Sequence, residues 1–144
     1  MPLKAEAISK RSKTAWFLRD VSFEATQGEI LAIFGPNGSG KSLLLQILSG
    51  REKSNGGRVT LDEMVLPHAS GTAIQYFGPY PNDGFIGRLS TVIRPGRSDN
   101  SADRVSAAIT SNARVILLDD VFCGLDRDGR EREFERLRKS AREF

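Results

Sequence analysis

Cysteine and histidine are almost absent from this sequence. It contains one cysteine, Cys123, and one histidine, His68, among 144 residues. A single cysteine excludes a disulfide within the chain and any metal cluster held by several thiolates. His68 follows Pro67 in a loop-like stretch, so we expect an exposed loop residue rather than a metal ligand. Cys123 has no histidine near it in sequence, and we interpret it as a packing residue rather than a nucleophile.

Long apolar runs are missing as well. The longest of them, at 30–34 and 115–118, are far too short to cross a bilayer. Residues 1–13 are mixed and basic, unlike a secretory signal segment. We therefore expect a protein that stays in the cytoplasm unless another chain brings it to a membrane. The net charge of +3 is compatible with anionic ligands but is too small to indicate nucleic-acid binding by itself.

The rest of the composition is that of an ordinary folded domain. Hydrophobic residues make up 39% and charged residues 27% of the chain, which predicts a single domain over residues 1–144 with a buried core. Periodicity predicts strands at 21–25, 29–34, 58–61, 64–66, 72–77 and 114–118. It predicts helices from residue 41 to a stop at Gly50, at 103–111 and at 128–144, with a loop at 78–87. This alternation favours an α/β fold with a parallel sheet.

Residues 35–42 match the phosphate-binding loop (P-loop) pattern G-x-x-x-x-G-K-[ST], between a predicted strand and a predicted helix. The glycines let the backbone curl so that N–H groups point at a phosphate, and the helix start adds its positive end. Lys41 would reach the β- and γ-phosphates of a nucleotide, and the Ser42 hydroxyl would bind Mg²⁺. The expected nucleotide-binding residues are Gly35, Pro36, Asn37, Gly38, Ser39, Gly40, Lys41 and Ser42.

Two consecutive acids, Asp119 and Asp120, follow the apolar run at 114–118. A strand that ends there places Asp119 at the carboxyl edge of the sheet, beside the P-loop. Its carboxylate would hold Mg²⁺ directly or through water. Asp120 is a candidate catalytic base that would orient or deprotonate an attacking water. Lys41 and Asp120 are therefore the expected catalytic residues.

These motifs resemble the ATP-binding-cassette (ABC) ATPase family. The approach to the loop at 18–33, the loop itself, the sequence Leu-Leu-Leu-Gln-Ile-Leu-Ser-Gly at 43–50 and the hairpin start at 56–59 are similar to the family pattern. Residues 123–126 resemble its D-loop. The resemblance implies a P-loop NTPase core with a mostly parallel sheet plus N-terminal antiparallel strands. It also implies an aromatic residue that stacks on adenine, for which Trp16 is the best candidate; a buried anchor on the first strand is the alternative role for Trp16.

The sequence departs from the family pattern in its middle. Only 78 positions separate the loop lysine from Asp119, fewer than in a complete cassette, so the helical subdomain is expected to be largely missing. The family's signature position falls at 97–101 and keeps only Ser98, while Gln75 lies a few residues early for the Q-loop glutamine. Asp120 stands where the family has glutamate, whose side chain is one methylene longer. The sequence also ends before the position of the family's switch histidine.

The leading interpretation is an ATP-binding subunit of an ABC-type transporter, with ATP and Mg²⁺ as ligands. It would work with transmembrane subunits and with a second ABC ATPase subunit, identical or different, at the cytoplasmic side of the membrane. We expect firm MgATP binding and slow or absent hydrolysis by the chain alone. A non-catalytic or degenerate ATP-sensing module is one alternative. A soluble DNA-associated ABC-type ATPase is another, but its only support is the basic helix at 127–142, whose interleaved glutamates indicate a solvated face, so no nucleic-acid partner is expected. A small-molecule or nucleoside kinase shares the P-loop but fits residues 18–23 and 123–126 less well.

Overall fold

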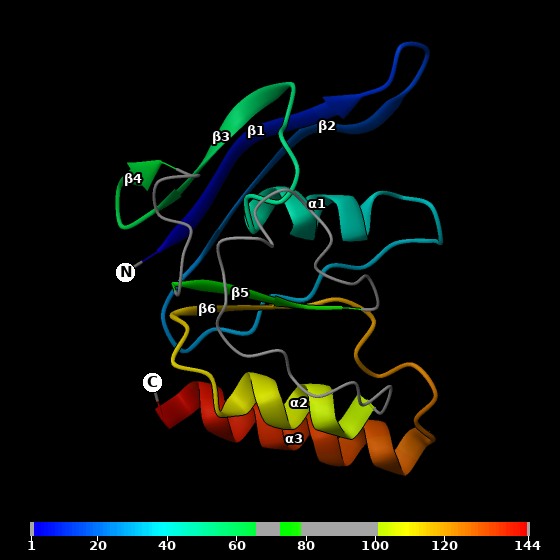
Figure 1. Ribbon diagram of the computed structural model, residues 1–144, viewed down its shortest axis with the longest axis vertical. Helices are drawn as coiled ribbons and strands as arrows, with labels where there is room; N and C mark the ends of the chain where they lie inside the picture. The colour runs from blue at the N-terminus through cyan, green and yellow to red at the C-terminus, as the bar shows by residue number, and fades with distance from the viewer. Residues whose placement is uncertain (1, 66–72, 79–100, 144) are drawn as a thin grey trace.

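Two β-sheets with one helix between them organise the protein. The computed structural model describes residues 2–65, 73–78 and 101–143. Figure 1 shows helix α1 (Lys41–Leu48) between a four-stranded sheet and a pair of parallel strands. Helices α2 (Ser101–Ile109) and α3 (Arg127–Glu143) lie side by side on the other side of that pair (Figure 1). The predicted α/β class, with N-terminal antiparallel strands and few helices, is confirmed.

The first sheet is antiparallel, with its strands in the order β2–β1–β3–β4. Its strands are β1 (Leu3–Arg11), β2 (Trp16–Ala25), β3 (Gly56–Leu61) and β4 (Met64–Val65). Leu3 and Ala5 of β1 lie opposite Leu61 and Val59 of β3, and all four are buried. Buried positions therefore recur at every second residue, as they do in a sheet that packs one face on a core. β3 begins at Gly56, two residues before the strand start predicted at residue 58.

Helix α1 packs against this core. Its buried residues are Leu44, Leu45, Ile47 and Leu48. Leu48 is only 1% exposed, and burying one such side chain fully stabilises the fold by about 1.5–3 kcal/mol. The predicted stop at Gly50 is confirmed, because the helix ends at Leu48 and Gly50 takes a left-handed φ of 73°. The core thus fixes the helix whose first residues carry the P-loop motif.

The second sheet is a parallel pair, β5 (Ile74–Phe77) and β6 (Val115–Leu118). Tyr76 pairs with Leu117 in the register of the two strands. Ile74, Tyr76 and Leu117 belong to the same core cluster as the leucines of α1, so this face of the pair lies against the helix. Both strands end at the same edge, and the residue after β6 is Asp119.

The predicted strand at 29–34 is wrong. The structure assigns no strand there, and Phe34 is 90% exposed. Ile30 and Leu31 are also exposed, and only Ile33 packs against the core. A strand needs a neighbour for its backbone hydrogen bonds, and among the described residues none pairs with this segment. Local apolar composition alone therefore gave a false strand.

Several predicted features lie outside the described residues. These are His68, most of the loop at 78–87 and most of the family's signature position at 97–101, including Ser98. Of the described part, the helices predicted at 103–111 and 128–144 are confirmed as α2 and α3, and Val105 and Ala108 of α2 are buried. Cys123 is exposed, so its predicted packing role is wrong.

Candidate nucleotide-binding site

The P-loop curls in the way that its glycines allow. Gly38 and Gly40 have φ values of 80° and 90°, in the left-handed region that favours glycine. Gly40 also packs closely, because a Cβ there would lie 2.9 Å from the carbonyl oxygen of Phe17 and from a methyl group of Leu18. Gly40 is the N-cap residue of α1 and makes no side-chain cap. The backbone N–H groups at the start of α1 are thus left for an anion.

Lys41 lies over the loop that precedes it. Its Nζ donates hydrogen bonds to the carbonyl oxygens of Gly35 at 2.8 Å and Pro36 at 2.7 Å. These two carbonyls hold the ammonium group at the mouth of the loop. An ammonium group is a compact, mobile cation on a flexible stem. It can exchange carbonyl partners for phosphate oxygens with little rearrangement.

Ser42 and Asp119 meet although 77 positions separate them in sequence. The Ser42 hydroxyl donates to Oδ1 of Asp119 at 3.0 Å. Asp119 is the buried charged residue of the described core, at 6% exposure. Its backbone N–H donates to the carbonyl oxygen of Phe77 at 2.8 Å, which continues the β5–β6 ladder by one residue. The parallel pair therefore places this carboxylate at the P-loop, where the sequence predicted it.

Tyr76 belongs to the site although it is not among the binding, metal or catalytic residues predicted from the sequence. Its hydroxyl donates to Oδ2 of Asp119 at 2.6 Å, and the side chain is buried. Burial, followed by the hydrogen bond and the negative charge of Asp119, raises the pKa of Tyr76 well above its usual value. The phenol therefore stays neutral and acts as a donor. The one signal that could have indicated this role is the position of Tyr76, which is an inward-facing residue near the end of β5.

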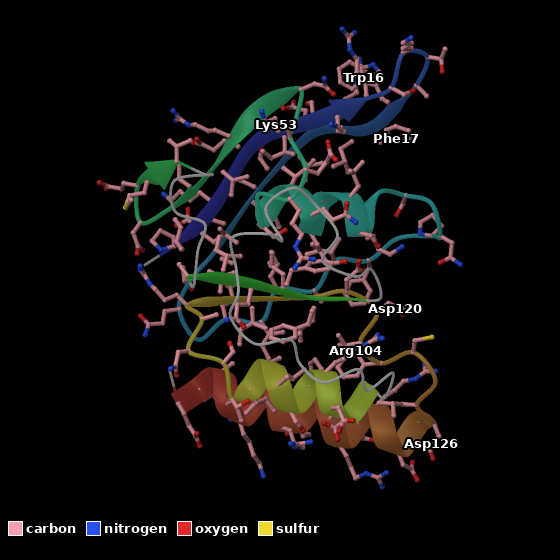
Figure 2. All side chains as sticks on the ribbon, in the orientation of Figure 1. Trp16, Phe17, Lys53, Arg104, Asp120 and Asp126 are labelled. Atoms are coloured by element: carbon pink, nitrogen blue, oxygen red, sulfur yellow. The ribbon has the colours of Figure 1, made fainter. Side chains whose placement is uncertain are left out.

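Asp120 differs from Asp119 in burial, backbone conformation and side-chain hydrogen bonding. It is exposed, and its φ of 52° lies in the left-handed region, where a non-glycine residue is uncommon. Its backbone carbonyl accepts a hydrogen bond from the N–H of Cys123, and its side chain makes no hydrogen bond within the described residues. Figure 2 shows Asp120 at the edge of the β5–β6 pair, where the chain turns toward Asp126 and α3.

The donor set fits Mg²⁺. A buried carboxylate and a hydroxyl in hydrogen-bond contact are hard oxygen ligands, and Mg²⁺ in nucleotide sites takes one or two such protein ligands besides phosphate oxygens and water. Ser42 and Asp119 would hold the ion, and it would neutralise charge on the phosphates. Lys41 would add a second positive charge from the other side of the loop.

Two exposed aromatic residues lie at the hairpin end of β2. Trp16 and Phe17 are each 50% exposed (Figure 2). The guanidinium groups of Arg11 and Arg19 lie 5.6 and 5.8 Å from the centroid of the Trp16 ring. The alternative role of Trp16 as a buried anchor is therefore wrong. The carbonyl of Phe17 packs against Gly40 of the P-loop, which makes Phe17 a second aromatic candidate beside the nucleotide.

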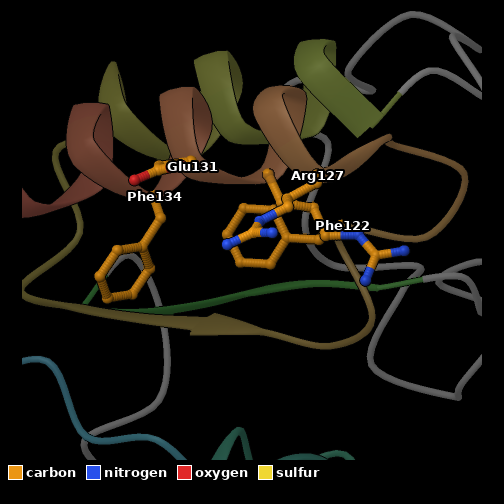
Figure 3. Close-up of a pocket in the computed structure, with 5 residues that line it drawn as sticks. Phe122, Arg127, Glu131 and Phe134 are labelled. Atoms are coloured by element: carbon orange, nitrogen blue, oxygen red, sulfur yellow. The ribbon is translucent and has the colours of Figure 1, made fainter.

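A separate hollow lies between the turn after β6 and helix α3. Figure 3 shows Phe122, Arg127, Glu131 and Phe134 around it, and it measures roughly 480 Å³. Phe134 is 44% exposed there. None of the predicted nucleotide-binding residues lines it. This part of α3 is thus only partly covered.

The parallel strands that end at Asp119, the P-loop at the start of α1 and the antiparallel sheet together define a domain with a P-loop NTPase fold. A family model described as ABC transporter matches residues 18–90, half of the chain. The chain belongs to this family. Its ATP-binding members are ATPases, and their ATP-binding domains bind ATP, usually with Mg²⁺.

Curated relatives carry the same assignment in their names. The chain is 30% identical over 123 residues to a sulfate/thiosulfate import ATP-binding protein of Agrobacterium fabrum, covering 81% of this chain and 35% of that protein. It is 46% identical over 103 residues to a hemin import ATP-binding protein of Gloeobacter violaceus, covering 69% and 38%. The chain thus spans little more than a third of the length of these relatives.

Solved structures show the same fold. A putative ABC transporter ATP-binding protein from Pyrococcus furiosus aligns with a TM-score of 0.76 at 14% identity, covering 99% of this chain and 87% of that one. A nucleotide-free ATP-binding cassette from an ABC transporter aligns with a TM-score of 0.77 at 18% identity, covering 99% and 78%. No helix among the described residues is long and apolar enough to span a bilayer.

Proposed function

We propose that this chain binds MgATP at the P-loop and serves as the ATP-binding subunit of an ABC-type transporter. The single observation that carries the proposal is the hydrogen bond between Ser42 and the buried Asp119. It joins the two expected Mg²⁺ ligands across 77 positions of sequence. Lys41, held at the mouth of the loop, supplies the positive charge that would face the β- and γ-phosphates.

The partners in this proposal are transmembrane transporter subunits and a second ABC ATPase subunit, identical or different. The relatives' names support it, since they are import ATP-binding proteins for sulfate/thiosulfate and hemin. The chain would then lie at the cytoplasmic side of the membrane, held there by its partners. Substrate choice would belong to the transmembrane subunits.

The same proposal includes slow hydrolysis by the isolated chain. Asp120, the proposed base, is exposed and has no side-chain hydrogen bond within the described residues. A base that is not held in place orients a water poorly, and small misplacements cost large factors in rate. An ATP-sensing module without catalysis is therefore the second candidate function, and the exposure of Asp120 is the observation that favours it.

A DNA-associated ATPase has weaker support. Its basis was the basic composition of α3, but Arg136 pairs with Glu133 and Arg138 pairs with Glu135 within that helix. These pairs balance part of the positive charge on its surface. A helix with interleaved charges of both signs is typical of a solvated face.

Equilibrium binding of a fluorescent ATP analogue in the presence of Mg²⁺ tests the proposal. We expect saturable binding by the native chain and a loss of roughly ten- to hundredfold in Lys41→Ala, since hydrogen bonds to charged groups contribute about 1.5–3 kcal/mol. Lys53→Ala is the matched control, because it removes the same charge from the segment between α1 and β3 (Figure 2). Equal affinities of the Lys41 and Lys53 variants, or no binding by the folded native chain, would contradict it.

A further inference from the structure

Both oxygens of the Asp119 carboxylate have a donor. Ser42 donates to Oδ1 at 3.0 Å, and the Tyr76 hydroxyl donates to Oδ2 at 2.6 Å. The two donors come from different elements: Ser42 from the first turn of α1, and Tyr76 from β5. An aspartate held at one oxygen can still turn about its side-chain bonds, whereas one held at both oxygens has a fixed carboxylate plane.

Tyr76 is itself held firmly. Its backbone lies in the parallel ladder opposite Leu117. The guanidinium of Arg51 lies 4.2 Å from the centroid of its ring. The backbone of Gly78 packs against the hydroxyl end of the ring, where any Cβ would collide with it. The hydroxyl is therefore a rigid donor and not an adaptable surface group.

A buried ring alone would explain the position of Tyr76 as core filling. However, the ring of a phenylalanine would fill the same volume, and the hydroxyl would then be unnecessary. The hydroxyl lies 2.6 Å from the carboxylate that is expected to hold the metal. Groups that donate to a metal-binding carboxylate orient it, and their loss commonly lowers metal affinity.

We propose that Tyr76 is a positioning residue for the magnesium site, whose hydroxyl fixes Oδ2 of Asp119 and leaves Oδ1, beside Ser42, as the oxygen available to the ion. The inference rests on the proposed MgATP site and adds to it a residue from β5. Tyr76 touches neither nucleotide nor metal in this account. It acts through Asp119 only.

The test is a Mg²⁺ titration of nucleotide affinity in Tyr76→Phe, which removes the hydroxyl and keeps the ring. We expect the Mg²⁺ concentration for half-maximal tightening to rise about tenfold, the lower end of the effect of such supporting groups. Affinity for the nucleotide in EDTA should change less than twofold, because the P-loop contacts are untouched. A purely structural role would weaken binding equally in both conditions.

Ser49→Ala is the matched control. It also deletes a partly buried hydroxyl, which donates to the Gln46 carbonyl at 2.9 Å and lies away from Asp119. Its Mg²⁺ titration should match that of the native chain. Thermal unfolding of Tyr76→Phe should stay within a few degrees of the native value; a variant that fails to fold would contradict the proposal and assign Tyr76 to the core.

The outcomes separate this inference from the proposed function. If the native chain shows tightening by Mg²⁺ and Tyr76→Phe shows the same titration, the positioning role is wrong and the MgATP site stands. If the native chain binds no nucleotide, or binds it without any effect of Mg²⁺, the proposed site fails and the role of Tyr76 fails with it. A shift confined to Tyr76→Phe supports both.

Discussion

Asp119 and Asp120 are neighbours in sequence, yet they belong to two different regions of the molecule. Asp119 is 6% exposed and is held by Ser42, Tyr76 and the backbone of Phe77. Asp120 is exposed, has a left-handed φ and begins the turn that leads to α3. The first region, which we call the binding region, comprises the P-loop, α1 and the ends of β5 and β6. The second, the turn region, comprises residues 120–126 and α3.

The difference between them separates binding from hydrolysis. Binding of a nucleotide needs donors and a metal ligand that are held before the ligand arrives, and the binding region has them. Hydrolysis needs in addition a base that holds a water within a fraction of an ångström of its target. The turn region offers an exposed aspartate for this role. The chain should therefore retain ATP better than it cleaves it.

The largest expected effect concerns stability, and it would sharpen the contrast in packing between the two regions. Leu48→Ala, at a side chain 1% exposed, should lower the free energy of unfolding by about 2–5 kcal/mol through lost burial and a new cavity. Phe134→Ala, at a ring 44% exposed on α3, should cost less than about 1 kcal/mol. Urea unfolding followed by circular dichroism measures both values. Similar costs for the two variants would show that α3 is packed as well as α1.

The next effect concerns the metal. Asp119→Asn keeps the shape of the side chain but removes its negative charge, so Mg²⁺ should no longer tighten ATP binding. We expect a loss of at least about tenfold in affinity at saturating Mg²⁺, a factor reached even by residues that only support a metal ligand. Isothermal titration calorimetry with and without Mg²⁺ measures it.

Asp128→Asn is the control for that experiment, since Asp128 is exposed in the first turn of α3. It removes the same charge from the turn region and should leave the affinity unchanged. If both variants lose Mg²⁺ dependence, the loss comes from overall charge. If neither does, Asp119 is not a metal ligand.

A third pair of variants tests the turn region directly. Asp120→Asn should change ATP affinity by less than about twofold, because an exposed side chain outside the P-loop contributes little to binding. Asp120→Glu should raise the rate of hydrolysis about tenfold, because the added methylene extends the carboxylate toward the nucleotide. Single-turnover kinetics at saturating Mg²⁺ report the rate. Weaker ATP binding in Asp120→Asn would place Asp120 in the binding region and contradict the division into a binding region and a turn region.

The smallest effect concerns the aromatic residue that is expected to stack on adenine. Trp16→Ala should weaken ATP binding by up to about tenfold, since aromatic contacts contribute about 0.5–1.5 kcal/mol beyond their buried area. Phe17→Ala is the matched variant, because its ring is equally exposed and its backbone lies at Gly40. Fluorescence binding assays compare the two. A loss of ATP affinity in Phe17→Ala alone would assign the stacking role to Phe17 instead of Trp16.

Local patterns predicted most elements of the fold correctly. The helix from Lys41 to a stop at Gly50 is set by neighbouring residues, namely the leucine spacing and the glycine that ends it. The strand Val115–Leu118 was also predicted, because a short apolar run that contains β-branched residues and is bounded by polar residues is typical of a buried strand. The P-loop is a contiguous motif and required no knowledge of the fold.

Two features that depend on distant partners were missed. The segment 29–34 has the composition of a strand, but backbone pairing decides whether one forms, and composition does not report it. Tyr76 lies 43 positions from Asp119, and its hydroxyl meets the carboxylate only through the register of β5 and β6. The structure shows a buried ring whose hydroxyl donates a hydrogen bond to Asp119.

One single-turnover measurement tests the central claim, that binding is retained and hydrolysis is weak. The native chain, in excess over radiolabelled ATP with Mg²⁺, is separated from free nucleotide at successive times, and the bound label is resolved into ATP and ADP. The account predicts that label is bound and is recovered mostly as ATP after many minutes. Conversion to ADP within about a second, the rate of an ordinary enzyme, would contradict it. Absence of bound label on the folded chain would contradict it equally.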